Sequence, residues 1–262
     1  MDQVFQHKGA NIHYYDQGKG QTVVLLHGFL CSSKIWKDYV QELKKKYRVI
    51  VPDLPGHGKS DSIGYLHSME LMADCVFELL RSLKVRKAQF VGHSMGGYIA
   101  LALLEKYPDN CKSVTLFNST AADDPEEKKR DRGRAIEVIK TNYSLYISQV
   151  IPNLFYTGKK PFKRQITSVM EMAKEASQKG VIACQEGMKL RSNREIIVRF
   201  AACPVHYIIG KNDSVLKYQE IISQAEESEK VTYYLSENGG HMCMYEDKEA
   251  VFQSLSSFLK KN

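Results

Sequence analysis

The sequence predicts an α/β domain built on a largely parallel sheet. Through the first half of the chain, apolar runs alternate with segments of helical spacing, and this rhythm indicates βαβ units. The run Thr22 to Leu26 is apolar without interruption after its first residue, which is typical of a strand buried on both faces. A length of 262 residues suffices for one large domain of this class or for two small ones.

The elements of the first half can be placed in order. Two short strands come first, joined by a turn at Gly9. A later apolar run that ends at Pro52 predicts another strand. The predicted strands are 4–7, 12–15, 22–26, 47–51, 88–91 and 113–117. The predicted helices are 35–46, 66–83 and 95–106, each with apolar residues on one stripe.

The rhythm breaks after Asn118, because no buried strand follows between residues 121 and 187. A charged segment at 123–134 precedes a single apolar stripe from Ile136 to Val150. Pro152 and Pro161 end this stripe, and a further helix is predicted at 166–179. Strands return at 204–209 and 231–235, with helices at 215–227 and 248–260. The sequence therefore predicts a core of residues 1–120 and 188–262 with a helical insertion at 121–187.

Charge and composition exclude several classes of protein. The net charge is +7, and residues 121–200 hold 16 basic and 10 acidic residues, so most of the excess lies in that segment. These charges are scattered, which argues against nucleic-acid binding and favours a solvated helical surface over attraction of an anionic substrate. No stretch of 18 apolar residues predicts a membrane span, and the start of the chain lacks a signal-peptide pattern. We therefore expect a cytoplasmic protein with no membrane partner.

The six cysteines predict neither a disulfide framework nor a metal site. None of them forms a C-x-x-C pair, and their spacing matches no zinc pattern. Free thiols are the default for a protein without an export signal. We accordingly expect no metal.

Gly92-His93-Ser94-Met95-Gly96 is the most informative motif. It follows a predicted strand directly and precedes a predicted helix. A serine on so tight a strand-to-helix turn holds its hydroxyl away from the backbone, beside the N-terminus of the next helix. The pattern predicts that Ser94 is a nucleophile, although a glycine-rich turn with an idle serine would have the same local sequence.

A nucleophilic serine needs a base, and that base needs an acid to orient it. His241 follows two glycines after the last predicted strand, and Asp213 follows the strand at 204–209, so that the chain order is Ser, Asp, His. The other histidines that could serve as the base are His7, His13, His57, His67, His93 and His206. Asp123 and Asp124 are the rival acids, but their run is typical of the charged start of a helix.

The developing oxyanion of an acyl-transfer reaction needs two N–H donors. The turn Leu25-Leu26-His27-Gly28-Phe29 ends a predicted strand, and Met95 follows the predicted nucleophile. We expect the backbone N–H groups of Phe29 and Met95 to form the oxyanion hole. His27 is expected to brace this loop without transferring protons.

Taken together, these motifs resemble the α/β-hydrolase superfamily. The resemblance spans nearly the whole chain and rests on 25–29, 52–60 (Pro-Asp-Leu-Pro-Gly-His-Gly-Lys-Ser), 91–97, 210–213 and 239–241. It implies an eight-stranded, mostly parallel sheet, a helical cap at 121–187, a Ser94–Asp213–His241 triad and no cofactor. Within the superfamily the chain looks closest to small capped carboxylesterases and enol-lactonases, although it lacks their frequent Arg-Pro-Asp sequence at 191–193.

The expected activity is hydrolysis of a small carboxylic ester or related acyl compound through an acyl-enzyme. Hydrolysis of a C–C bond or a thioester on the same triad is one alternative, and a small-molecule receptor with little turnover is another. Candidates to line an apolar pocket, or else to be simple core residues, are Leu30, Tyr98, Tyr143, Tyr146, Phe155 and Tyr156.

Overall fold

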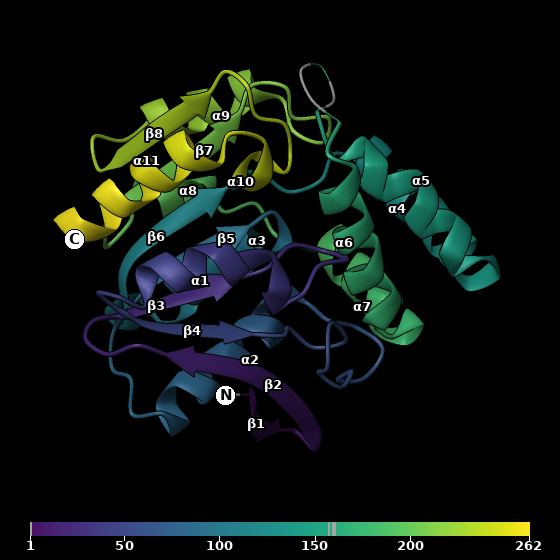
Figure 1. Cartoon of the computed structure of the whole chain (residues 1–262), viewed down its shortest axis with the longest axis horizontal. Coiled ribbons are helices and arrows are strands. Elements are labelled where there is room, and N and C mark those ends of the chain that lie inside the picture. Colours follow the sequence, from purple (N-terminus) through teal and green to yellow (C-terminus); the bar gives the residue numbers. More distant parts are fainter. Residues whose placement is uncertain (1, 157, 159–160) are drawn as a thin grey trace.

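The computed structural model describes residues 2–156, 158 and 161–262. In this part of the chain the strands form one eight-stranded sheet with the order β1-β2-β4-β3-β5-β6-β7-β8 (Figure 1). Both β1–β2 and β2–β4 pair antiparallel, and all the other neighbours pair parallel. The predicted fold class is therefore confirmed. The strands are β1 Asp2–His7, β2 Ala10–Gln17, β3 Thr22–Leu26, β4 Arg48–Pro52, β5 Ala88–His93, β6 Cys111–Phe117, β7 Val205–Gly210 and β8 Val231–Ser236.

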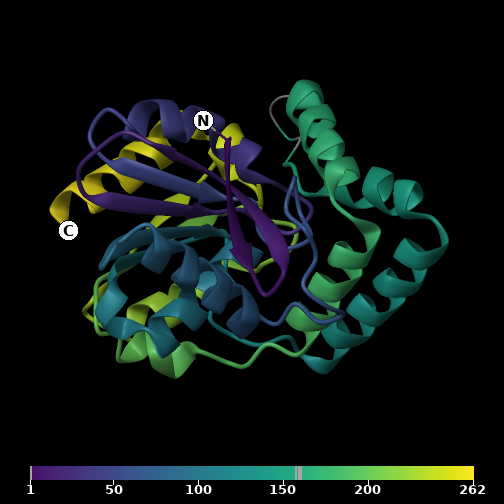
Figure 2. The ribbon, with the colours of Figure 1, turned by 90° about the horizontal axis from the view of Figure 1, so that it is seen from below.

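Helices cover both faces of the sheet, as Figure 2 shows. One apolar core joins the sheet to α2, α3, α8 and α9, and a second joins it to α1 and α11. In β3, Val24 and Leu26 belong to the first core, while Val23 and Leu25 belong to the second. This alternation explains the uninterrupted apolar run, since successive side chains of a strand point to opposite faces. The bounds are α1 Lys37–Leu43, α2 Met69–Ser82, α3 Met95–Lys106, α8 Glu195–Arg199, α9 Tyr218–Glu226 and α11 Lys248–Lys261.

The predicted insertion contains four helices: α4 Glu126–Thr141, α5 Tyr143–Asn153, α6 Lys163–Glu175 and α7 Gln178–Lys189. They pack together at one end of the molecule, and the arrowheads of β4 and β6 point toward them (Figure 1). The carboxyl ends of parallel strands are where α/β folds place their ligands, so these helices stand over the edge that carries the predicted site. The division into core and cap stays a prediction, and its ranges include residues 1, 157, 159 and 160, which lie outside the described residues.

Two helix boundaries in this region differ from expectation. The stripe from Ile136 to Val150 is split between α4 and α5 at Asn142, whose side chain accepts a hydrogen bond from the Leu145 N–H at 2.9 Å. The helix expected to run to residue 179 ends at Glu175, and Ser177 caps α7 through the Gly180 N–H at 3.0 Å. In both places a capping side chain interrupts an apolar pattern that continues in the next helix.

Helix α7 is packed closely onto the loop that follows β4. A Cβ atom added at Gly180 would lie 2.4 Å from the Gly56 Cα, and one added at Gly187 would lie 1.8 Å from the His67 carbonyl oxygen. Neither position can hold a side chain without displacing backbone. Both glycines therefore allow α7 to approach the core at backbone distance.

The remaining short helices are η1 Ser33–Trp36, η2 Pro108–Asn110 and α10 Cys243–Glu246. Neither α8 nor α10 was expected from the sequence, since five and four residues are too few to show a helical period. All six cysteines are buried free thiols. Among the described residues, no helix combines the length and hydropathy needed to cross a bilayer.

Candidate active site

Ser94 sits on a strained turn between β5 and α3. Its backbone φ of 50° lies in the left-handed region, which costs energy for any residue with a Cβ and persists where the surrounding structure enforces it. A Cβ at Gly96 would lie 2.3 Å from the Leu26 carbonyl oxygen, so the turn can pack against β3 only because residue 96 is glycine. Ser94 is the one residue of 91–100 that is partly exposed.

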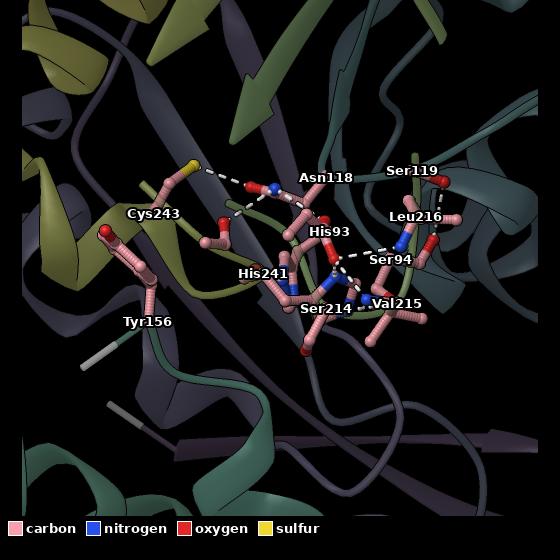
Figure 3. Close-up of polar contacts among 12 residues, drawn as sticks. His93, Ser94, Asn118, Ser119, Tyr156, Ser214, Val215, Leu216, His241 and Cys243 are labelled. Carbon is pink, nitrogen blue, oxygen red and sulfur yellow. Dashed lines mark hydrogen bonds and ion pairs between the residues drawn. The ribbon is translucent and has the colours of Figure 1, made fainter. Parts of the chain in front are cut away.

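The structure brings Ser94, His241 and Asp213 together at the carboxyl edge of the sheet. Figure 3 shows Ser94 and His241 beside each other. The His241 Nε2 lies 3.1 Å from the Ser94 Oγ, and the His241 Nδ1 lies 2.9 Å from the Asp213 Oδ2. The side chains of His241 and Asp213 are 4% and 1% exposed. This hydrogen-bonded chain is the geometry that a base and its orienting acid require.

Asp213 is held in its ionised form. Burial by itself would raise the pKa of this carboxyl group. The pKa is nevertheless lower than usual, because the charge of His241 and the hydrogen bonds from His241, the Val215 N–H and Asn118 outweigh burial. The Val215 and Leu216 N–H groups donate to Oδ1 at 2.7 and 3.1 Å. A carboxylate so fixed can orient the His241 ring and stabilise an imidazolium.

Asn118, at the carboxyl end of β6, is a site residue that the sequence reasoning missed. Its Nδ2 donates to the Asp213 Oδ2 at 3.0 Å and to the Gly240 carbonyl at 2.9 Å, while its Oδ1 accepts from the Cys243 thiol at 2.6 Å (Figure 3). Its φ of 45° is also left-handed. The sequence offered one indication of its role: Asn118 directly follows a predicted strand, at the edge of the sheet where the site lies.

The predicted oxyanion donors lie on the two loops that flank Ser94. A Cβ at Gly28 would lie 3.3 Å from the Ser94 Cβ, which places the Phe29 loop directly against the nucleophile. In residues 2–156, 158 and 161–262, the backbone N–H groups of Phe29 and Met95 have no hydrogen-bond acceptor. Two unpaired N–H groups beside a nucleophile can receive an oxyanion.

Two buried histidines brace the Phe29 loop as neutral rings. The His27 Nε2 accepts from the Leu54 N–H at 2.9 Å, and the His57 Nε2 accepts from the Leu30 N–H at 3.3 Å. Burial lowers the pKa of His27 to about 4 and that of His57 to about 3. Both rings therefore stay uncharged at neutral pH, in agreement with a bracing role for His27.

His93 adjoins Ser94, but it bonds to the backbone of the candidate base and not to the nucleophile. Its Nε2 donates to the His241 carbonyl oxygen at 2.9 Å, and burial lowers its pKa to about 3. The neutral ring thus ties the loop of the candidate base to the end of β5. In the structure His206 bonds to the hydroxyls of Thr232 and Ser254, and His13 to Asp2, so neither contacts Ser94.

The rival acid Asp124 has a different environment from the one expected. Helix α4 begins two residues later, at Glu126. The Asp124 side chain is fully buried, with ion pairs to Arg132 and to Arg191 (2.7 Å to the latter). The carboxylate ties the start of the insertion to α4 and to the segment that follows α7, and neither partner is a histidine.

The six candidate pocket residues fall into separate surroundings. Leu30, Tyr98 and Phe155 are buried, and the Arg191 guanidinium lies 4.2 Å from the centre of the Tyr98 ring. The Tyr143 hydroxyl donates to the Ala173 carbonyl inside the insertion. Tyr146 is buried as well, and its hydroxyl accepts a hydrogen bond from the Gln185 Nε2 at 2.9 Å. That any of the six lines a substrate pocket stays a prediction.

A cleft of about 440 Å³ lies between the insertion and the loop after Asp213, and Tyr146, Gln185, Ser214 and Val215 are among its lining residues. Tyr156 lies against the His241 loop, because a Cβ at Gly240 would be 2.9 Å from the Tyr156 Cβ. In the described part of the chain, no three His, Cys, Asp or Glu side chains gather as a metal site would require.

Comparisons with known proteins agree with this architecture. A family model for the α/β-hydrolase fold matches residues 21–135. The chain is 31% identical over 106 residues to the (E)-2-((N-methylformamido)methylene)succinate hydrolase of Acinetobacter baylyi, and the match covers only 40% of either protein. It is 27% identical over 257 residues, 93% of each protein, to the AB hydrolase superfamily protein YisY of Bacillus subtilis.

Among solved structures, a thermophilic esterase from Thermogutta terrifontis is similar over its whole length. The two chains share 29% identity with a TM-score of 0.93, and the match covers 100% of this chain and 98% of the esterase. The family model, the full-length relative and this structure agree that the chain has the α/β-hydrolase fold.

Proposed function

We propose that this protein is a serine hydrolase that cleaves a carboxylic ester or a related acyl compound through an acyl-enzyme. The observation that carries the proposal is the chain of hydrogen bonds from the Ser94 Oγ through His241 to Asp213. The name of the Thermogutta esterase, a protein similar over its whole length, supports ester cleavage. The assignment of Ser94, Asp213 and His241 as the triad is part of the proposal.

In the acylation step, the Ser94 Oγ attacks the carbonyl carbon and its proton passes to the His241 Nε2. The carbonyl oxygen becomes an oxyanion, which the Phe29 and Met95 N–H groups receive. Collapse of the tetrahedral intermediate breaks the bond to the leaving group, and His241 returns the proton to that group. Asp213 stabilises the imidazolium in both steps without taking the proton.

In deacylation, water replaces the leaving group and the same residues act again. The water gives a proton to His241 and its oxygen attacks the acyl carbon. The intermediate then releases the carboxylic acid, and Ser94 recovers its proton. No redox partner or metal ion enters this sequence of bond changes.

A fluorophosphonate probe tests the proposal, because it phosphonylates only an activated serine. We expect labelling of the wild type at Ser94, no labelling of Ser94→Ala, and full labelling of Ser148→Ala. Ser148 is a matched control, since it is exposed on α5 and bonds only within its helix. Undiminished labelling of S94A would refute the role of Ser94.

A substrate panel separates the proposal from its alternatives. Turnover of p-nitrophenyl esters that exceeds turnover of thioesters and β-diketones supports ester cleavage. The opposite order would instead identify a thioester or C–C bond hydrolase on the same triad. Stoichiometric binding of a small molecule with negligible product would identify a receptor.

A further inference from the structure

The end of α5 is fastened to both loops that carry the candidate base and acid. The Ser214 hydroxyl, next to Asp213, donates to the Asn153 carbonyl at 2.6 Å. The Tyr156 N–H donates to the Glu246 Oε1 at 2.5 Å. Figure 3 shows Tyr156 on one side of His241 and Ser214 close to that histidine. The segment 153–156 of the insertion therefore contacts the site through backbone groups at two points.

Glu246, on α10, joins this segment to the His241 loop. While its Oε1 accepts from Tyr156, its Oε2 accepts from the Gly240 N–H at 2.6 Å. Gly240 directly precedes His241, and a Cβ at Gly240 would lie 3.1 Å from both the Tyr156 N and the Glu246 Oε1. The three groups are thus in direct contact, with the carboxylate between two backbone donors.

Only a group with two acceptor oxygens can satisfy both donors. A glutamine would offer one acceptor oxygen and one NH₂ group, so its NH₂ would face a backbone N–H in place of a bond. A hydrogen bond to a charged group contributes more than one between neutral groups. The carboxylate therefore holds the insertion and the His241 loop in one fixed arrangement.

We infer that Glu246 is a positioning residue that couples the segment 153–156 to the candidate base His241. It touches neither the nucleophile nor the carbonyl in the proposed reaction. It acts by fixing the Gly240–His241 backbone against Tyr156, so that the position of the imidazole is linked to the position of the insertion. The catalytic part of this inference rests on the proposed function, whereas the coupling of the two backbone segments does not.

Glu246→Gln is the direct test, with Glu237→Gln as the matched control. Glu237 is an exposed glutamate on the same loop, and its carboxylate pairs with Lys211. Burial raises the pKa of Glu246 to about 7, so both tests are run at about pH 8.5, where the carboxylate is ionised. E246Q should fold, because the neutral amide has nearly the same shape and avoids the desolvation cost of a buried charge. Ser214→Ala loosens the second fastening without changing Glu246.

Hydrogen exchange of the backbone amides gives a readout that is independent of catalysis. We expect E246Q to lower the protection of the peptides containing Tyr156 or Gly240 by about tenfold, the effect of losing a hydrogen bond to a charged group, and E237Q to leave both unchanged. Wild-type protection of both peptides in E246Q would overturn the inference.

Ester turnover tests the catalytic part. We expect E246Q to lower kcat by about tenfold, with E237Q unaffected. The loss in the E246Q/S214A double variant should be smaller than the product of the single losses, since both bonds fasten one segment. Multiplicative losses, or unchanged kcat in E246Q, would overturn the coupling. Absence of fluorophosphonate labelling in the wild type would instead refute the proposed function and leave the exchange result to decide the fastening.

Discussion

Asn118 provides the sharpest prediction about the orienting acid. Asn118→Ala removes the amide that donates to the Asp213 Oδ2 at 3.0 Å and to the Gly240 carbonyl at 2.9 Å. The carboxylate keeps its bonds to His241, Val215 and Leu216, so it should stay in place with a looser orientation. The variant should fold with Ser94, His241 and Asp213 in place, although the Gly240 carbonyl and the Cys243 thiol also lose their bonds to Asn118.

The magnitude follows from the type of bond that is lost. A hydrogen bond to a charged group contributes about 1.5–3 kcal/mol, and about 1.4 kcal/mol corresponds to a tenfold change in rate. If this bond matters mainly when His241 becomes an imidazolium, kcat should fall about ten- to hundredfold. KM should change little, because the substrate does not contact Asn118 in the proposed mechanism.

Steady-state kinetics on a p-nitrophenyl ester measures the effect, and a second variant removes the contribution of backbone strain. The φ of 45° at residue 118 disfavours alanine, whereas glycine adopts it freely. Asn118→Gly should therefore lose as much kcat as N118A. A kcat within about twofold of wild type in N118G would refute the reasoning, because it would show that strain and not the lost donor lowers the rate in N118A.

Two further predictions concern stability. Gly187→Ala places a methyl group 1.8 Å from the His67 carbonyl oxygen. The free energy of unfolding, measured in urea, should therefore fall by about 2 kcal/mol or more. The control Gly133→Ala lies in open space on α4 and should not destabilise the protein. Burial lowers the pKa of His206 to about 4, below its value near 6.5 in the unfolded chain. Between these two pH values the unfolded chain binds a proton at His206 and the folded protein does not. The free energy of unfolding therefore decreases as the pH falls from about 6.5 to about 4. Urea titrations at pH 6 and 5 should show that His206→Gln reduces this pH dependence by about 1.4 kcal/mol per pH unit, and an unchanged slope would contradict a buried neutral His206.

The sequence predicts the sheet and the meeting of Ser94, Asp213 and His241 because each lies in the turn or loop that follows a strand. Local apolar runs indicate the strands, and the carboxyl ends of parallel strands lie at one edge of the sheet. The catalytic role of the three residues stays a prediction that labelling must test. The break at Asn142 escaped the periodicity, since a single capping residue hardly disturbs an apolar stripe.

Asn118 and Glu246 could not be found in this way. Each acts through contacts with residues distant in the sequence: 95 positions separate Asn118 from Asp213, and 90 separate Tyr156 from Glu246. A single polar residue after a strand or on a four-residue helix has no local pattern that sets it apart. Its role becomes visible only when the loops and the insertion are placed in space.

The close packing of α7 determines which segments of this fold could be exchanged between related proteins. Gly180 meets Gly56, and Gly187 meets the His67 carbonyl, at backbone distance. A chimaera that receives only residues 121–187 from a donor would bring a foreign helix against a recipient loop shaped for these two glycines. The unit of exchange is therefore the helical insertion together with the loop between Pro52 and Met69, and a graft that respects this boundary should keep the recipient's nucleophile elbow undisturbed.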